Sequence, residues 1–361
     1  MMSALPDLSD GRHVGMTTTI PVEVVLAAGL VPVDLNNLFI TADDPGALVR
    51  QAELAGYPRT CCGWIRGLYS TALAVGIKRV VAVTQGDCSQ THAMMETWQS
   101  VGIETIPFAY PYEGDVESLR TQIRRLCAAL GTTWQAAEEV RVKLVPVRRL
   151  LAQLDTMTWQ EHKITGAENH LWQVQSSDFN GDPARFCTEL EAFLDTAAAR
   201  APQPPALRLG YAGVPPIITD LYDFLEGRGA RVVFNEFQRQ FTMADSLEVD
   251  LLSQYLAYTY PYSVFGRLED INHHIALRSL DGLIHYVQSF CFRQIQDTLI
   301  KRSVGIPVLT LEGDAPGPLD ARSRLRVEAF LESLVARKRR AGPQGTAAGI
   351  PRQGDCGVGA S

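Results

Sequence analysis

Seven cysteines, at positions 61, 62, 88, 127, 187, 291 and 356, are the side chains of this 361-residue protein with the clearest chemical potential. Cys88 follows the strand-like run VVAVTQGD and precedes a helical stretch, and Cys291 stands in the same context after GLIHYVQSF. Cys62 opens CGWIRGLYSTALAVG, a predicted helix N-terminus where backbone N–H groups favour a thiolate. Ligand sites in open α/β sheets gather at the carboxyl ends of strands. Thiolates that converge there would suit iron or an iron–sulfur cluster.

Plain burial is the competing explanation for these three cysteines, because free cysteine often packs as a small apolar side chain. Cys62 and Cys88 are separated by 25 residues, and Cys88 and Cys291 by 202. Neither spacing matches a compact CxxC ribbon or a ferredoxin run. The spacing alone therefore leaves both explanations open.

The remaining cysteines are weaker candidates for ligands. Cys61 adjoins Cys62, and neighbouring cysteines rarely reach the same metal. Cys127 and Cys187 lie in helical patterns among Leu, Ala and Phe, which predicts core packing. Cys356 stands in a glycine-rich C-terminal segment, where we expect no ligand.

Several ionisable side chains near these positions have two interpretations. Glu23 in TTTIPVEVVLAAG could take part in proton transfer or could only complement the dipole of a helix N-terminus. His92, four residues after Cys88, could face a substrate or cluster, or could be an ordinary helix-surface histidine. The pair His273 and His274 could bind a metal, but packing or solvent exposure is favoured because no acidic partner lies at motif spacing.

Alternating apolar runs and helical patterns predict an α/β protein. Strands are expected near residues 80, 105, 208, 230, 282 and 306, with helices between them, and this order is typical of parallel sheets. The strands fall before residue 115 and after 205. The sequence therefore predicts two Rossmann-like (flavodoxin-like) lobes, 1–120 and 205–337, joined by a helical connector over 121–204. The polar, glycine-rich segment 338–361 is expected to be disordered.

Charge and motifs exclude several classes of protein. With 40 acidic and 33 basic residues the net charge is −7, and no basic stripe suggests a nucleic-acid partner. We find no secretory signal and no apolar run of roughly 18 residues that could span a membrane, so we expect a cytoplasmic protein without a membrane partner. No GxGxxG, GxxxxGK[ST], GxSxG or HExxH motif occurs. If ATP drives the chemistry, another protein must hydrolyse it.

Five segments together resemble the 2-hydroxyacyl-CoA dehydratase and benzoyl-CoA reductase family, over roughly residues 11 to 335. They are GRHVGMTTTIPVEVVLAAGLVPVDL, CGWIRGLYSTAL, VVAVTQGDCSQTHAMMETW, SFCFRQIQDTLIKRSVGIPVLTLEGD and ARSRLRVEAFLESL. The resemblance implies Cys62, rather than Cys61, as the first ligand of a [4Fe-4S] cluster, with Cys88 and Cys291 as the others. The cluster would lie in the cleft between the lobes with one iron open to substrate, as suits a catalytic centre.

The same resemblance implies the reaction and its partners. An ATP-hydrolysing iron–sulfur activator would deliver one electron, an (R)-2-hydroxyacyl-CoA would become a ketyl radical anion, and the ketyl would expel the 2-hydroxyl as water. Glu23, Ser89 or His92 would guide the proton, and a homologous second subunit, identical or not, would complete a dimer.

Two alternatives to this function remain. One is an activator-dependent reductase of benzoyl-CoA or double-cubane type, with a cluster shared between two chains, and the other is a non-catalytic partner subunit.

Two departures from the family pattern bear on the substrate. Family members usually carry Asp directly after the second cysteine, whereas here Asp87 precedes Cys88. Thr17, Thr18 and Thr19 stand where many relatives have a cysteine or a serine.

Overall fold

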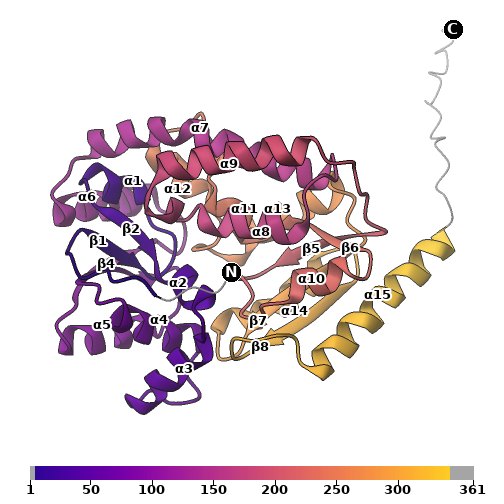
Figure 1. Ribbon diagram of the computed structural model, residues 1–361, viewed down its shortest axis with the longest axis horizontal. Coiled ribbons are helices and arrows are strands. Elements are labelled where there is room, and N and C mark those ends of the chain that lie inside the picture. The colour runs from indigo at the N-terminus through magenta and orange to yellow at the C-terminus, as the bar shows by residue number, and fades with distance from the viewer. Residues whose placement is uncertain (1–4, 342–361) are drawn as a thin grey trace, which may run out of the picture.

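Two four-stranded parallel sheets form the frame of the protein in a computed structural model that describes residues 5–341 (Figure 1). The first sheet has the order β2-β1-β3-β4 and the second has the order β6-β5-β7-β8. Because each sheet begins with its second strand and then continues 1-3-4, the two lobes share one topology. The predicted fold class of two Rossmann-like lobes is confirmed.

The first lobe alternates short strands with helices on both faces of its sheet. Helices α4 and α5 pack on one face through Leu68 and Trp98, with α3 packed on α4, and α1 and α6 pack on the other face through Val25 and Ile123. The elements are β1 (His13–Met16), α1 (Val22–Ala27), β2 (Val31–Asp34), α2 (Leu35–Thr41), α3 (Pro45–Leu54), α4 (Gly63–Ala74), β3 (Arg79–Gln85), α5 (Thr91–Ser100) and β4 (Glu104–Ala109).

A helical segment follows, as the sequence predicts, and its long helices run across both lobes at the top of Figure 1. The predicted boundary at residue 120 falls inside α6, which packs on β4. The elements are α6 (Val116–Leu130), α7 (Trp134–Trp159), α8 (Gly166–Gln175), the 3₁₀ turn η1 (Phe179–Gly181) and α9 (Pro183–Ala198).

The second lobe repeats the arrangement, with α10 and α15 on one face of its sheet and α13 and α14 on the other. Its elements are β5 (Leu207–Ala212), α10 (Leu221–Glu226), β6 (Ala230–Asn235), α11 (Glu236–Phe241), η2 (Ala244–Ser246), α12 (Leu251–Ala257), α13 (Val264–Leu277), β7 (Gly282–Gln288), η3 (Phe292–Gln296), α14 (Asp297–Ser303), β8 (Val308–Gly313) and α15 (Ala321–Ala341). Helix α15 continues four residues into the segment predicted to be disordered, and the rest of that segment, with Cys356, lies outside the described residues.

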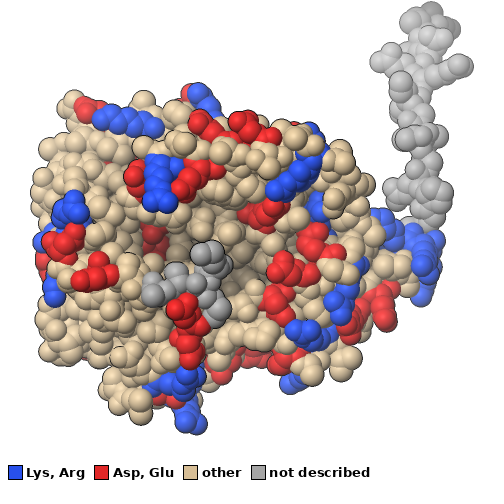
Figure 2. Space-filling view, viewed as in Figure 1, with Lys and Arg blue, Asp and Glu red and all other residues tan. Residues whose placement is uncertain are grey.

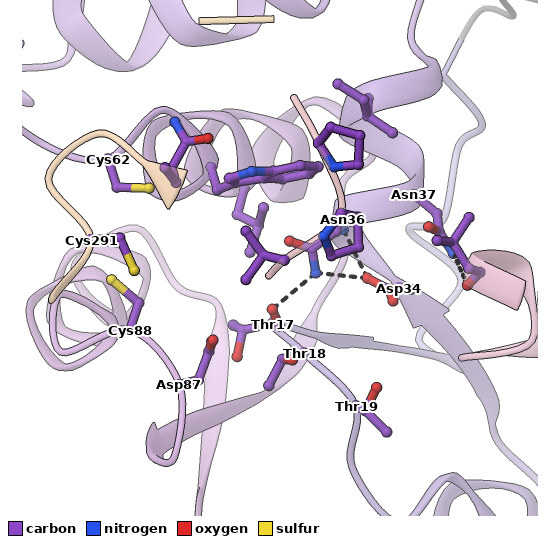
Figure 3. A pocket seen from close by; sticks show the side chains of 18 of the residues that line it. Thr17, Thr18, Thr19, Asp34, Asn36, Asn37, Cys62, Asp87, Cys88 and Cys291 are labelled. Carbon is purple, nitrogen blue, oxygen red and sulfur yellow. Dashed lines mark hydrogen bonds between the residues drawn. The ribbon is translucent and has the colours of Figure 1, made fainter. Parts of the chain in front are cut away.

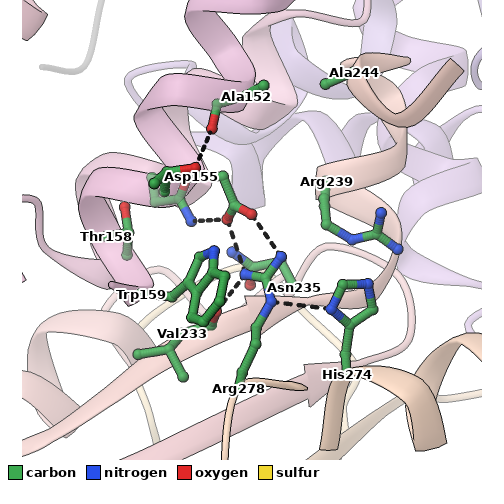
Figure 4. Close-up of polar contacts among 12 residues, drawn as sticks. Ala152, Asp155, Thr158, Trp159, Val233, Asn235, Arg239, Ala244, His274 and Arg278 are labelled. Carbon is green, nitrogen blue, oxygen red and sulfur yellow. Dashed lines mark hydrogen bonds and ion pairs between the residues drawn. The ribbon is translucent and has the colours of Figure 1, made fainter. Parts of the chain in front are cut away.

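A buried ion pair fastens the connector to the second lobe. Asp155 on α7 accepts hydrogen bonds from Arg278 at 2.6 and 3.1 Å, and Arg278 also donates to Nδ1 of His274 (Figure 4). Asp155 and Arg278 are 8% and 3% exposed. Because a buried charge is costly without its partner, this pairing fixes how α7 lies on the second sheet.

Acidic and basic side chains are interspersed over the face seen in Figure 2, with no continuous basic area on that face. Across residues 5–341, no helix combines the length and the hydrophobicity needed to cross a bilayer.

Candidate active site

A cavity of about 300 Å³ lies where the carboxyl ends of the two sheets meet. Its walls come from the β1–α1 loop, from α2 and α4, from the loop after β3, from α8, and from the loops after β5 and β7 (Figure 3). The strand-end rule for ligand sites in parallel sheets therefore holds for both lobes at once. The volume is at the lower end of the range for small-molecule pockets.

The cysteines at positions 62, 88 and 291 all line this cavity, and their side chains point toward a common space in Figure 3. Cys88 follows β3 and Cys291 follows β7, which are the third strands of the two lobes. Cys62 is the N-cap residue of α4 and Cys291 is that of η3. Three separate elements thus bring the three predicted ligand positions together.

Two opposing influences act on these thiols. Burial raises the pKa of Cys62 to about 12, although the backbone N–H groups of Ile65 and Trp64 lower it. Burial also raises the pKa of Cys88 and of Cys291, against backbone N–H groups of Gln90 and Arg293. Each sulfur thus faces N–H donors at the start of a helix or turn, in surroundings that favour the thiolate only when a cation is near.

Thiolate sulfur is the donor that iron–sulfur clusters take, so three cysteines on one cavity wall have the chemistry that such a group requires. Over residues 5–341, no group of three or more His, Cys, Asp or Glu side chains is close enough to hold one metal ion. Cys61 has a different setting, because it does not line the cavity and its thiol donates to the side-chain oxygen of Gln90 at 3.1 Å.

Close backbone approaches hold the cysteine-bearing loops in place. Gly86 has φ +92°, and a Cβ atom there would lie 2.7 Å from Cβ of Pro261, so the turn from β3 into Cys88 requires glycine. Gly63, next to Cys62, lies directly against the backbone of Asp314 in the second lobe. Gln90 reaches back from the start of α5 and accepts from the backbone N–H of Cys62 at 3.1 Å.

A polar group beside the cysteines links the two lobes. The Tyr260 hydroxyl donates to Asp87 at 2.6 Å, and Arg293 packs over the Tyr260 ring at 4.6 Å. Arg293 also donates to the carbonyl of Gly86 at 3.0 Å. Burial raises the pKa of Asp87, and Tyr260 and Arg293 act against that rise. These contacts fix the loop that carries Cys88 against the segment that carries Cys291.

A second polar group lies on the wall formed by β2 and the connector. Asp34 lines the cavity and accepts from the backbone and side-chain N–H groups of Asn36 at 2.9 and 2.8 Å and from Ser177 at 2.7 Å. Its own backbone N–H donates to Asp178 at 2.6 Å. Burial, and then the nearby Asp34, raise the pKa of Asp178 to about 7.

The structure places Glu23 away from the cavity. Its carboxylate is fully buried and accepts from Arg148 at 2.6 Å, from Gln254 at 2.8 Å and from Tyr255 at 2.8 Å. Burial raises the pKa of Glu23, but the Arg148 guanidinium and these hydrogen bonds outweigh it, so the net shift is downward. The geometry assigns Glu23 to the contact between α1, α7 and α12.

Ser89 and His92 also do not line the cavity, and both side chains are exposed. Proximity to Cys88 in the sequence does not bring them to the pocket, because α5 leads the chain away from it. The expectation for the histidine pair holds, since His273 is exposed and His274 packs against Phe234 with ring centroids 4.7 Å apart. Cys127 is buried in α6, and Cys187 is partly buried against the core of α7 and α9.

Asp34, Tyr260 and Arg293 are lining residues with hydrogen-bonding or charged groups that the sequence did not single out. Arg293 lies two residues after a predicted ligand position and Asp34 ends a strand, so position offered a signal for these two. Tyr260 carried none, because its partner Asp87 is 173 residues away in the chain.

Comparison with known proteins agrees with this geometry. No curated protein matches the chain. The family model described as 2-hydroxyglutaryl-CoA dehydratase, D-component, matches residues 17–334, a span that includes every strand except β1 and all three cysteines of the cavity. The chain belongs to the 2-hydroxyglutaryl-CoA dehydratase D-component family.

Proposed function

We propose that this protein is the iron–sulfur subunit of an activator-dependent dehydratase that removes water from an (R)-2-hydroxyacyl-CoA. The observation that carries the proposal is the meeting of Cys62, Cys88 and Cys291 in one cavity between two lobes of the same topology. Membership of a dehydratase family supports the reaction class. In this proposal the three thiolates hold a [4Fe-4S] cluster.

When bound, such a cluster supplies an electron and an iron coordination position that the protein leaves open. The residues of the chain then bind and orient the substrate. The apolar walls of the cavity keep water from the reacting thioester, which strengthens electrostatic interactions inside the site. Thr18, a partly buried residue of the β1–α1 loop, lines the cavity. In this proposal its hydroxyl donates a hydrogen bond to a substrate oxygen.

The contacts among Asp87, Tyr260 and Arg293 act by positioning in this proposal. They join the loop after β3 to the second lobe, so that the cysteine thiols of the two lobes keep their relative placement. A cofactor bound across two lobes needs such a connection, because small misplacements at a catalytic centre cost large factors in rate.

The proposal includes partners outside this chain and a place in the cell. A homologous second subunit forms the dimer, and an ATP-hydrolysing activator provides the electron, because the chain has no phosphate-binding loop of its own. We place the reaction in the cytoplasm, where CoA thioesters and ATP are available.

Electron counting tests the reaction type. Purified protein, kept without oxygen and supplied with its second subunit, its activator, ATP and a reductant, should convert many equivalents of 2-hydroxyacyl-CoA to enoyl-CoA per electron consumed. Consumption of reductant in proportion to product would contradict a dehydratase and would support a reductase of the benzoyl-CoA type.

A further inference from the structure

The charges that line the cavity restrict what it can accept. Asp34, Asp87 and Arg293 are the charged lining residues in the described part of the chain. His170 also lines it, but burial lowers the pKa of His170 to about 3, so this histidine is neutral at physiological pH. The wall thus carries two carboxyl groups, whose pKa values burial raises, and a single guanidinium.

That guanidinium is already engaged. Arg293 is 8% exposed, donates to the Gly86 carbonyl at 3.0 Å and lies over the Tyr260 ring at 4.6 Å, next to Asp87. Moving Arg293 toward a ligand would break its hydrogen bond to Gly86 and its contact with the Tyr260 ring, and would take its charge away from the buried Asp87.

The hydrogen-bond donors of Asp34 are neutral groups of Asn36 and Ser177, and burial raises the pKa of Asp34. Among the described residues, no basic side chain donates a hydrogen bond to it. A ligand carboxylate placed in the cavity would therefore lose its water and lie near two acidic side chains without gaining a cation in return.

The rest of the wall favours an apolar ligand. Ile40, Leu68, Leu171, Val174, Ile218 and Trp64 line the cavity. Burying a methylene group against such side chains is favourable in proportion to the apolar area removed from water.

From these observations we infer that the cavity selects an uncharged, apolar acyl group, such as a branched aliphatic or aromatic one, and rejects an acyl group with a second carboxylate. The inference rests on the proposed function and names the substrate class for it. It sets this chain apart from the dicarboxylic substrate that its family's description names.

Calorimetric binding to the anaerobically purified protein tests the inference without requiring turnover. The two probes are (R)-2-hydroxy-4-methylpentanoyl-CoA and (R)-2-hydroxyglutaryl-CoA, which share the CoA moiety and differ in the charge at the end of the acyl chain. We expect the methylpentanoyl thioester to bind on the order of tenfold tighter or more, because only the glutaryl thioester must bury an unpaired carboxylate.

Leu171→Arg provides a second readout, because Leu171 lines the cavity yet is 46% exposed and so tolerates a charged side chain. This variant should narrow or reverse the preference by giving the carboxylate a cation. Leu54→Arg is the matched control, since Leu54 is 90% exposed on α3 and does not line the cavity, and the preference should stay as in the wild type.

The outcomes separate the two claims. Equal or tighter binding of the glutaryl thioester by wild-type protein, or a preference that Leu171→Arg does not change, would overturn the inference and leave the proposed function standing. Binding of neither thioester would refute the proposed function itself, and the inference with it.

Discussion

Replacing Arg148 with methionine should strongly destabilise the protein, because it would leave the Glu23 carboxylate buried without its cation. Glu23 and Arg148 are 0% and 2% exposed, and their nitrogen and oxygen atoms are 2.6 Å apart. Removing one partner of a buried ion pair costs about 3–5 kcal/mol. The remaining donors, Gln254 and Tyr255, are neutral and cannot replace the charge.

The assay is urea unfolding of the metal-free protein followed by circular dichroism, so that loss of iron does not affect the result. Arg149→Met is the control, because Arg149 pairs with Glu248 on the surface, where both side chains are more than half exposed. Surface pairs contribute at most about 1 kcal/mol. The double variant Glu23→Gln with Arg148→Met should recover part of the loss, since it removes both charges.

This prediction also decides what Glu23 does. If Arg148→Met costs no more than Arg149→Met, the assignment of Glu23 to a structural contact is wrong. A Glu23→Gln variant that unfolds like the wild type but cannot dehydrate substrate would equally refute the assignment and return Glu23 to the chemistry.

Three further perturbations follow from the geometry. Arg278→Met should also lower the free energy of unfolding by about 3–5 kcal/mol, by leaving Asp155 buried without a cation, and urea unfolding would detect it. Gly86→Ala should lower the iron bound per chain, because φ +92° and the nearness of Pro261 disfavour a side chain there. An iron content at the wild-type level would contradict the claim that this turn requires glycine. Burial, helped by nearby arginines, lowers the pKa of His274 to about 2 from 6.5, so the unfolded chain gains a proton that the folded one does not, and stability should fall as the pH drops below 6.5. The loss of stability at low pH should be smaller in His274→Asn, and unfolding curves recorded between pH 5 and 7.5 would measure the difference.

Periodic apolar runs made much of the fold predictable. Six of the eight strands follow from runs rich in Val, Ile and Leu, and their alternation with helices implies parallel sheets. Strand β2 was harder to predict from the sequence, because it spans only four residues and includes Pro32. Proline is tolerated there because β2 lies at the edge of its sheet, where a missing N–H costs no hydrogen bond of the sheet. The two lobes share a topology without a recognisable sequence repeat, because many different apolar sequences satisfy the same burial pattern.

That the three cysteines would meet at one cavity was predictable for a physical reason, whereas the places of Glu23 and His92 in the fold were not. Parallel strands end at one edge of a sheet, so residues that follow the third strand of each lobe must face the same cleft. Glu23 has a partner on α7, 125 residues away, that no local pattern reveals. The expectation for His92 rests on its distance from Cys88 in the chain, whereas its exposure depends on the direction in which α5 leaves the strand.

The most direct test of the central claim is the iron and acid-labile sulfide content of anaerobically purified protein, together with the electron paramagnetic resonance spectrum after reduction. The account predicts about four irons per chain in the wild type. Iron should be lost in Cys62→Ala, Cys88→Ala and Cys291→Ala and kept in Cys61→Ala, whose thiol lies outside the cavity. No iron in the wild type, or iron that is indifferent to the three substitutions, would contradict the cluster and leave these cysteines as packing residues.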